Sequence, residues 1–483
     1  MAFEYAPAPE SRSIVDIKAS YGLFIDGEFV DGRGSSFKTI NPATEETLAE
    51  IAEASDADVD LAVKAARRAF RGWSRMSGKE RAKYLFRIAR IIQERGRELA
   101  VLESIDNGKP IKESRDVDVP IVAAHFFYYA GWADKLEHAG LGANPQPLGV
   151  AGQVIPWNFP LLMLAWKIAP ALACGNTVVL KPAETTPLTA LLFAEICQQA
   201  DLPPGVVNIV TGAGSTGQAI VSHPDVDKVA FTGSTDVGKA IARAVAGTDK
   251  KVTLELGGKA ANIVFDDAAI DQAVEGIVNG IFFNQGHVCC AGSRLLVQES
   301  IADEVLTKLK RRMSTLRVGD PLDKNTDIGA INSAEQLARI HELTGIGDAE
   351  GADRWSPACD LPSSGFWFAP TVFTGVTQAH RIAREEIFGP VLSVLTFRTP
   401  AEAVEKANNT PYGLSAGVWT EKGSRILHMA SELRAGVVWA NTFNKFDPAS
   451  PFGGYKESGY GREGGRQGLA AYLKAEDISG GKR

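Results

Sequence analysis

The sequence is poor in cysteine, and the few cysteines it has fit no disulfide framework. They number five, an odd count, and they are widely spaced along 483 residues. No Cys-x-x-Cys pair and no Cys/His combination stands at the spacing of a structural metal site, so no metal is predicted. Disulfides are rare in reducing compartments, and this cysteine usage therefore predicts a cytoplasmic location. The five are Cys174, Cys197, Cys289, Cys290 and Cys359.

Long apolar runs and an excess of basic residues are also missing. The nearest approach to a membrane span, residues 161–174, is interrupted by Lys167 and Pro170 and is too short to cross a bilayer. Residues 1–13 lack the basic-then-apolar layout of a signal peptide. The net charge of −7 and the pI of about 5.7 argue against a general polyanion-binding surface. The composition thus predicts neither a membrane nor a nucleic acid as partner.

A chain of 483 residues is too long for one compact core, so two or more domains are expected. A β-hairpin is predicted on either side of Asp26-Gly27, and a Gly/Ser/Pro-rich stretch, 345–365, is predicted to be an exposed loop. The apolar spacing predicts helices over residues 57–72, 79–107 and 119–132.

From Gly149 onward, short apolar strands alternate with segments long enough for helical crossovers. This alternation is typical of βαβ units and of a parallel sheet. The simplest interpretation is two α/β domains that join near residues 256–258. The predicted strands are residues 178–181, 207–210, 228–233, 251–256, 262–265, 294–298 and 391–397.

The stretch 282–294, FFNQGHVCCAGSR, places two adjacent cysteines between a helix-like and a strand-like apolar run. Taken alone, such a pair is more often structural than reactive, because reactivity needs surroundings that favour the thiolate. Upstream, KVTLELGGKAANIVF puts Glu255 at the end of an apolar strand beside Gly257 and Gly258. A third segment, PWNFP, carries Asn158 in a sharp bend, where an asparagine alone would be explained by the turn.

These three segments together resemble the aldehyde dehydrogenase family, and the resemblance runs from about Phe24 to about Tyr472. It implies an α/β fold with two Rossmann-like parallel-sheet domains and a small, reduced oligomerisation hairpin. The domains implied are residues 1–133 and 148–257 for cofactor binding, 258–456 for catalysis, and 134–147 with 457–483 for oligomerisation and the C-terminal segment.

The resemblance implies oxidation of an aldehyde to the carboxylic acid with NAD, through a cysteine thiohemiacetal and a thioester. In the family register the nucleophile lies three residues after the glycine of FFNQG, which is Cys289, and Cys290 is a packing neighbour. Asn158 and the backbone N–H of Cys289 would stabilise the oxyanion. Glu255 would be the general base that releases the acid, and desolvation should raise its pKa. Relatives that transfer the acyl group to CoA lack this glutamate, so hydrolysis is expected.

Two glycine patterns compete for the cofactor's pyrophosphate. GAGSTG, residues 212–217, matches G-x-G-x-x-G after a strand, but this short pattern recurs by chance. FTGSTDVG opens a helix directly after the strand KVAF, and helix N-termini attract phosphate. The family uses the segment corresponding to the second pattern. Gly233, Ser234 and Gly238 are therefore the predicted contacts, and 212–217 is interpreted as a structural turn.

The remaining cofactor contacts also follow from the resemblance. Lys181 and Glu184, where VVLK ends, would reach the adenosine ribose, and a carboxylate there repels a 2′-phosphate, so NAD is favoured over NADP. A solvated Lys/Glu pair is the plain alternative. Glu386 would bind the nicotinamide ribose and Phe388 would pack against the nicotinamide; the plain alternative, a buried turn that ends at Gly389-Pro390, is compatible with these roles. Ile155 and Trp157 complete the predicted set.

Six side chains are predicted, from the same resemblance, to line the aldehyde tunnel: Phe159, Leu162, Met163, Trp166, Phe446 and Phe452. No Arg or Lys falls among them to hold a substrate carboxylate. A hydrophobic aliphatic or aromatic aldehyde is therefore the leading hypothesis. Asp447 could favour a cationic aldehyde, but it could equally point to solvent.

The sequence departs from the family in places that bear on regulation and assembly. His287 replaces the usual Gln or Glu before the nucleophile, and packing is the favoured interpretation over tuning of the thiolate. The link 136–146 is several residues shorter than in tetrameric members, and the tail 475–483 is more polar than the family's last interface strand. A homo-oligomer, with a dimer favoured, or a partner chain is therefore predicted. The alternative functions are a catalytically quiet scaffold subunit of a hetero-complex and a cofactor-free thiol esterase activity.

Overall fold

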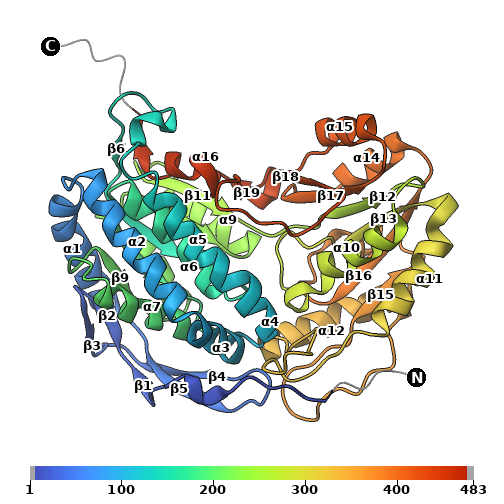
Figure 1. The fold of residues 1–483 in the computed structure, drawn as a ribbon, viewed down its shortest axis with the longest axis horizontal. Coiled ribbons are helices and arrows are strands. Elements are labelled where there is room, and N and C mark those ends of the chain that lie inside the picture. The colour runs from blue at the N-terminus through green and yellow to red at the C-terminus, as the bar shows by residue number, and fades with distance from the viewer. Residues whose placement is uncertain (1–5, 476–483) are drawn as a thin grey trace.

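The computed structural model describes residues 6–475, which form two lobes, each built around a largely parallel sheet between helices (Figure 1). The first sheet has eight strands in the order β19-β11-β10-β7-β8-β9-β2-β3. Five of them are parallel: β7 (Val150–Val154), β8 (Thr177–Lys181), β9 (Val207–Ile209), β10 (Lys228–Thr232) and β11 (Lys251–Glu255). The antiparallel edges are β2 (Leu23–Ile25), β3 (Glu28–Val30) and β19 (Gly459–Tyr460).

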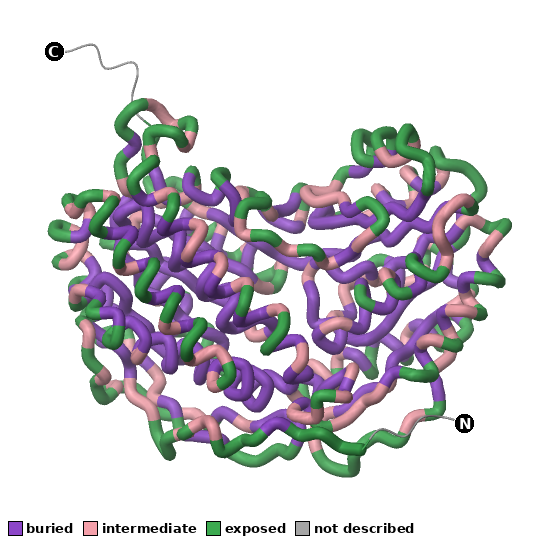
Figure 2. Tube along the Cα trace, in the orientation of Figure 1, coloured by how far each residue is buried: buried purple, intermediate pink, exposed green. Residues whose placement is uncertain are grey.

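Helices cover both faces of this first sheet, which is why β7, β8 and β10 are buried throughout rather than alternating in burial. One face packs on α1 (Asp56–Trp73), α8 (Gly214–Ser222) and α9 (Thr235–Val245). The other packs on α2 (Gly78–Glu94), α3 (Gly96–Asn107), α5 (Val119–Ala130), α6 (Pro160–Ala173) and α7 (Leu188–Gln199). Figure 2 shows the central strands and the inner helix faces buried, with exposed residues on the outer helix faces and in turns.

The second sheet has seven strands in the order β14-β15-β16-β13-β12-β17-β18. They are β14 (Asp353–Trp355), β15 (Thr371–Thr374), β16 (Val391–Phe397), β13 (Arg294–Gln298), β12 (Ala261–Val264), β17 (Ser415–Trp419) and β18 (Val437–Ala440). Its helices are α10 (Ile270–Phe282), α11 (Ala302–Met313), α12 (Ala334–Ala349), α14 (Pro400–Asn408) and α15 (Gly423–Glu432). The expected α/β architecture with two parallel-sheet units is therefore confirmed.

Short elements complete the chain. A three-stranded sheet contains β1 (Ser20–Tyr21), β5 (Thr47–Ala52) and β4 (Ser36–Ile40). The short helices are α4 (Ile111–Glu113), α13 (Arg381–Arg384) and α16 (Gly465–Ala470). A π-helical turn spans Ser114–Asp118, and 3₁₀ turns span Arg12–Ile14, Leu136–Ala139, Phe283–Gly286, Glu299–Ile301 and Lys456–Ser458.

The predicted hairpin forms, with Asp26 and Gly27 both at positive φ, the conformation of a type I′ turn. Two predictions were wrong in part. The helix expected over 79–107 is two helices, because the backbone of Arg95 (φ −93°, ψ 13°) leaves the helical range. The loop expected over 345–365 begins inside α12 and contains β14. Gly347 belongs to the helix because it packs closely against Ile382 of α13.

The segment predicted as a reduced oligomerisation hairpin, 134–147, contains one 3₁₀ turn and the two-residue strand β6 (Gln146–Pro147). This strand pairs antiparallel with β20 (Leu473–Lys474), close to the end of the described chain. Its role in assembly and the predicted domain limits stay predictions, and residues 476–483 of the polar tail lie outside the described residues. Within residues 6–475, no helix is both long and apolar enough to cross a membrane.

Candidate functional site

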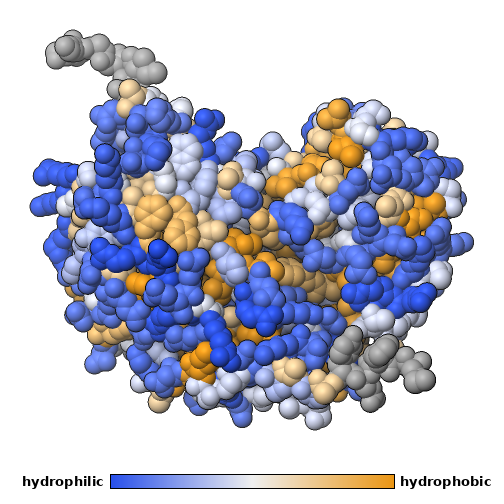
Figure 3. All heavy atoms as spheres, viewed as in Figure 1, coloured by the Kyte–Doolittle hydropathy of each residue, from blue (hydrophilic) through white to orange (hydrophobic). Residues whose placement is uncertain are grey.

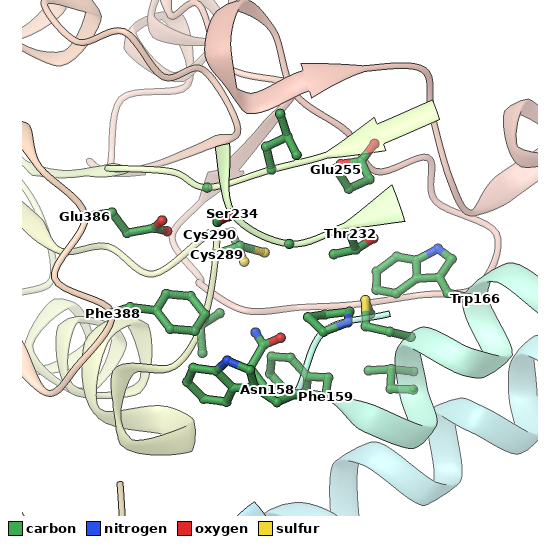
Figure 4. Close-up of a pocket in the computed structure, with 18 of the residues that line it drawn as sticks. Asn158, Phe159, Trp166, Thr232, Ser234, Glu255, Cys289, Cys290, Glu386 and Phe388 are labelled. Atoms are coloured by element: carbon green, nitrogen blue, oxygen red, sulfur yellow. The ribbon is translucent and has the colours of Figure 1, made fainter. Parts of the chain in front are cut away.

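A cavity of about 270 Å³ lies between the two sheets, and its walls come from both lobes. From the first lobe come the bend before α6, α6 itself and the ends of β10 and β11; from the second come the cysteine loop and residues 386–388. Figure 4 shows the side chains of these segments pointing toward one common space. On the face drawn in Figure 3, apolar side chains gather toward the centre and polar ones cover the outer rims.

This cavity brings together most of the predicted site residues. All three predicted catalytic residues and all six predicted tunnel residues line it. Of the predicted cofactor contacts, those that line it are Trp157, Gly233, Ser234, Glu386 and Phe388. The other four, Ile155, Lys181, Glu184 and Gly238, do not line it.

The four remaining predicted contacts lie beside the first sheet, at or near the carboxyl ends of its strands. The backbone N–H of Ile155 donates to the carbonyl of Lys181 at 3.1 Å. Lys181 Nζ lies 3.4 Å from Glu184 Oε2 and donates to the carbonyl of Gly212 at 2.5 Å. Glu184 is exposed and lines a separate hollow. Gly238 faces the sheet from α9, and a Cβ there would overlap the side chain of Leu256.

The predicted nucleophile Cys289 follows a turn in which Asn284 and Gln285 both have positive φ (50° and 53°). Its side chain is half-buried and lines the cavity. The contact with the Cys290 thiol, together with burial, raises the pKa of Cys289 well above its ordinary value. The thiol therefore keeps its proton in this state, and a partner must remove it before attack.

Asn158 lies just before α6, next to the cysteine loop, and its side chain lines the cavity (Figure 4). Its Nδ2 donates to the carbonyl of His287 at 2.8 Å. A side-chain amide carries two hydrogens, so one donor remains after this bond. Asn158 therefore does more than satisfy the turn, because its Nδ2 is held in place with one hydrogen still able to donate.

Glu255 ends β11, and its carboxylate is buried without a hydrogen-bond partner among the described residues. Burial, and then the negative charge of Glu463, raise the pKa of Glu255 well above its ordinary value, although the Lys167 ammonium opposes them. A raised pKa is the expectation drawn from the sequence. It gives the carboxylate the basicity that a general base near neutral pH requires.

An ion pair between Lys167 and Glu463, which was not predicted from the sequence, lies beside Glu255. Both side chains are buried, and they come from α6 and from the segment before α16. Glu463 also lines the cavity. The sequence contained a signal for this pair, because a lysine inside the otherwise apolar run 161–174 must find a buried partner of opposite charge.

Glu386 lies on the side of the cavity opposite Glu255 (Figure 4), where its Oε1 accepts the backbone N–H of Gly258 at 3.0 Å. Any side chain at Gly257 would overlap this carboxylate, so the pair of glycines lets the backbone approach it closely. Burial raises the pKa of Glu386 to about 7.

The segment after β10 has the features of a phosphate site. Ser234 caps α9, a helix of 11 residues, and its hydroxyl accepts the backbone N–H of Val237 at 3.4 Å. A Cβ at Gly233 would overlap the ring of Phe231, so the backbone there stays bare. The buried hydroxyls of Thr232 and Thr235 have no partner in the described structure. Free N–H groups, a bare backbone and unused hydroxyls fit the pyrophosphate of a dinucleotide.

The competing glycine pattern, 212–217, has a local structural explanation. Gly212 has a φ of 152°, its carbonyl accepts Lys181, and a Cβ there would overlap Thr216. Thr216 in turn donates to the carbonyl of Ala54 at 3.1 Å. These contacts are those of a strand-to-helix turn, and the choice between the two patterns stays a prediction.

His287 packs among aromatic rings. Its ring lies 4.8 Å from that of Trp157 in a T-shaped contact and 5.9 Å from that of Phe388 in a stack. Burial, and then the charge of Lys109, lower the pKa of His287 to about 3, so the imidazole is neutral. These contacts agree with the packing role favoured for His287.

The inner end of the cavity is aromatic. The Trp166 ring lies 5.4 Å from that of Phe452 and 6.3 Å from that of Phe446. Asp447 is exposed and does not line the cavity, and its Oδ1 accepts the backbone N–H of Ala449 at 2.6 Å. Within residues 6–475, no group of three or more His, Cys, Asp or Glu side chains is placed to hold a metal ion.

The chain is similar to known proteins over nearly its whole length. The family model described as "Aldehyde dehydrogenase family" matches residues 29–478. Retinal dehydrogenase 2 of Homo sapiens is 46% identical over 471 residues, which are 95% of this chain and 91% of that protein. An NAD+ complex of aldehyde dehydrogenase from Bacillus cereus has a TM-score of 0.90 at 44% identity, over 94% of this chain and 95% of that one. Indole-3-acetaldehyde dehydrogenase with NAD+ has a TM-score of 0.92 at 41% identity, over 95% and 96%.

Proposed function

The chain belongs to the aldehyde dehydrogenase family, and from this premise we propose which of its residues act and which aldehydes it takes. The reaction itself is the NAD-dependent oxidation of an aldehyde to the carboxylic acid. The observation that carries the proposal is the convergence of Cys289, Asn158 and Glu255 on one cavity from three separate segments. A catalytically quiet scaffold would not need this set.

Cys289 is the nucleophile. Its sulfur attacks the carbonyl carbon, the C=O π bond breaks, and the oxygen takes the negative charge of a thiohemiacetal. The free hydrogen of Asn158 Nδ2 and the backbone N–H of Cys289 stabilise that oxyanion. NAD, when bound, supplies the acceptor for the hydride that leaves this carbon. A thioester then remains on Cys289.

Two proton transfers surround this step. The raised pKa of Cys289 means that its thiol must lose a proton as the aldehyde binds, and that proton passes to solvent water and leaves the site. In the second half of the reaction Glu255 takes a proton from water, which attacks the thioester carbon and expels the Cys289 thiolate. Burial sets most of the raised pKa of Glu255, and the charges of the Lys167–Glu463 pair beside it modify that pKa in opposite directions.

The residues that hold the cofactor are the nine predicted ones. Gly233 and Ser234, at the start of α9, receive the pyrophosphate, and Glu386 receives the nicotinamide ribose. Glu184 receives the adenosine ribose, and its exposed carboxylate repels a 2′-phosphate, so NAD is preferred over NADP. The others are Ile155, Trp157, Lys181, Gly238 and Phe388.

The substrate is a hydrophobic aliphatic or aromatic aldehyde. The tunnel is lined by Phe159, Leu162, Met163, Trp166, Phe446 and Phe452, and none of these can hold a carboxylate. Asp447, which could have favoured a cationic aldehyde, is engaged with its own turn. The names of two relatives, retinal dehydrogenase 2 and indole-3-acetaldehyde dehydrogenase, denote apolar aldehydes.

The test is NADH formation with a panel of aldehydes that spans short aliphatic, long aliphatic, aromatic, anionic and cationic members. Cys289→Ala should lose roughly a thousandfold or more in kcat, while the matched neighbour Cys290→Ala should keep most activity. Equal losses in the two variants, or a preference for anionic aldehydes, would contradict the proposal. Repeating the panel with NADP measures the cofactor preference.

Glu255→Gln separates the two halves of the reaction. A glutamine cannot take a proton from water, so deacylation should slow by roughly a hundredfold or more. Rapid mixing should then show a burst of NADH close to one per active site, followed by a slow steady rate. Absence of a burst, with an equally slow first turnover, would show that Glu255 is needed before hydride transfer and would contradict the proposed role in deacylation.

A cytoplasmic location and a homo-oligomeric assembly, dimeric or with a partner chain, remain part of the proposal. So does the division into a cofactor-binding unit (1–133 and 148–257), a catalytic unit (258–456) and the segments 134–147 and 457–483. Their support is the cysteine usage, the short link before β7 and the two sheets described above.

A further inference from the structure

The segment that carries Asn158 is braced at three successive residues by three different side chains. Asn107 Nδ2 donates to the carbonyl of Trp157 at 2.5 Å. The Lys109 ammonium lies 4.1 Å from the centre of the Phe159 ring, a cation–π contact. Between them, the carbonyl of Asn158 itself accepts a hydrogen bond from Asn284 Nδ2 at 2.7 Å.

Asn284 also contacts the cysteine loop. Its Nδ2 lies 3.3 Å from the carbonyl of His287, the same carbonyl that accepts Asn158 Nδ2 at 2.8 Å. The side-chain amide of Asn284 thus holds the backbone of Asn158. The carbonyl of His287, which both amides contact, holds the side chain of Asn158. The single hydrogen of Asn158 Nδ2 left over must then point away from His287, into the cavity.

Asn284 can make these bonds only because its backbone is left-handed (φ 50°, ψ 42°). Asparagine tolerates this conformation better than most residues, although it remains uncommon. Glu113 stabilises it, because its buried carboxyl accepts the backbone N–H of Asn284 at 2.9 Å. Glu113 comes just before the π-helical turn Ser114–Asp118, a kind of distortion found frequently near functional sites.

We infer that Asn284 is a positioning residue, which fixes the oxyanion-stabilising amide of Asn158 before the aldehyde binds. This inference rests on the proposed role of Asn158. The benefit is preorganisation, since an amide already aimed at the developing charge needs no rearrangement during the reaction. The competing explanation is that Asn284 only satisfies its own turn.

A double-mutant cycle with Asn284→Asp and Asn158→Ala distinguishes the two explanations. Aspartate keeps the size and tolerates the left-handed backbone, but an ionised carboxylate donates to neither carbonyl. We expect Asn284→Asp to lower kcat roughly 10- to 100-fold, the scale of a small misplacement, with the Kd for NAD unchanged. In the Asn158→Ala background the same change should cost little more, because the side-chain amide that Asn284 positions is gone even though the backbone carbonyl of residue 158 remains.

The outcomes separate the inference from its premise. If Asn158→Ala leaves kcat unchanged, the proposed oxyanion role fails, and the inference fails with it. If Asn158→Ala slows the enzyme but the two losses multiply in the double mutant, Asn158 keeps its role and the positioning role of Asn284 is overturned. Non-additive losses support both.

Asn208→Asp is the matched control. Asn208 is equally buried, and its Nδ2 also donates to two carbonyls, those of Val178 at 3.1 Å and Gly205 at 2.8 Å, away from the cavity. It should lower the melting temperature without changing kcat, and an equal loss of kcat would overturn the inference. If Asn284→Asp does not fold, Glu113→Leu tests the same positioning, because it removes the acceptor of the Asn284 backbone N–H and should lower kcat. Glu113→Gln keeps an acceptor at that place and should restore kcat.

Discussion

Glu386 is a half-buried residue whose carboxyl has its pKa raised by desolvation to about 7. Above that pH it is ionised and accepts hydrogen bonds strongly, while below it the carboxyl binds a proton and loses acceptor capacity. If Glu386 holds the nicotinamide ribose, NAD affinity should be highest above pH 7 and fall below it. Hydrogen bonds to charged groups are worth about 1.5–3 kcal/mol, against about 0.5–1.5 kcal/mol for neutral ones, so protonation should raise the Kd roughly tenfold in full.

Calorimetric titration of NAD between pH 6 and pH 8.5 measures this effect. Glu386→Gln should bind NAD weakly at every pH, because an amide does not titrate. The neighbouring Glu385→Gln is the control, since Glu385 is paired with Arg381 in a partly exposed salt bridge and should leave the pH dependence intact. A wild-type Kd that does not change across pH 7 would remove Glu386 from the cofactor site.

Helix α9 carries Ser234 at its N-terminus, and the position of this N-terminus depends on the close packing of the helix on strand β11. Gly238 makes that approach possible, since a Cβ would overlap the buried side chain of Leu256. Gly238→Ala should therefore push α9 outward, at a cost of about 1–3 kcal/mol in the free energy of unfolding. The displaced N-terminus should also weaken NAD binding, and both effects are measured by thermal melts with and without NAD.

The control for this change is Gly345→Ala in α12, where nothing lies within 4 Å of the added Cβ. A glycine inside a helix costs about 0.5–1 kcal/mol relative to alanine, so this variant should be slightly more stable and bind NAD normally. Unchanged NAD affinity in Gly238→Ala would mean that the position of α9 does not matter for the cofactor.

Predictability from the sequence differed among elements for a physical reason. Strands such as 294–298 and 391–397 were predicted with their observed limits, because a buried parallel strand is a continuous apolar run. The break at Arg95 was not predicted, although Gly96 follows it directly, because a single glycine can be tolerated inside a helix. The Arg95 side chain pairs with Glu98 and with Glu195, which is distant in sequence. Such tertiary contacts are not visible in local spacing.

At the scale of the whole molecule, the open question is assembly. The segment 134–147 offers only the two-residue ladder between β6 and β20, which leaves little backbone for pairing between subunits. A dimer is therefore expected, with a native mass of twice the chain's 51.6 kDa. Light scattering coupled to size-exclusion chromatography measures that mass. A value of four chains would contradict the expectation and would show that the short link still supports a tetramer.

Local sequence patterns are enough to predict which chemistry is available to this chain. The order of Asn158, Glu255 and Cys289 along the chain, and the motifs around them, identify the family and its α/β fold, because motif and periodicity are local properties. Only the tertiary structure decided how that chemistry is tuned. Lys167 and Glu463 lie 296 residues apart and meet beside Glu255, and Asn284 meets Asn158 across 126 residues. Burial and pairing of charges depend on which distant segments pack together, and spacing along a chain does not carry that information.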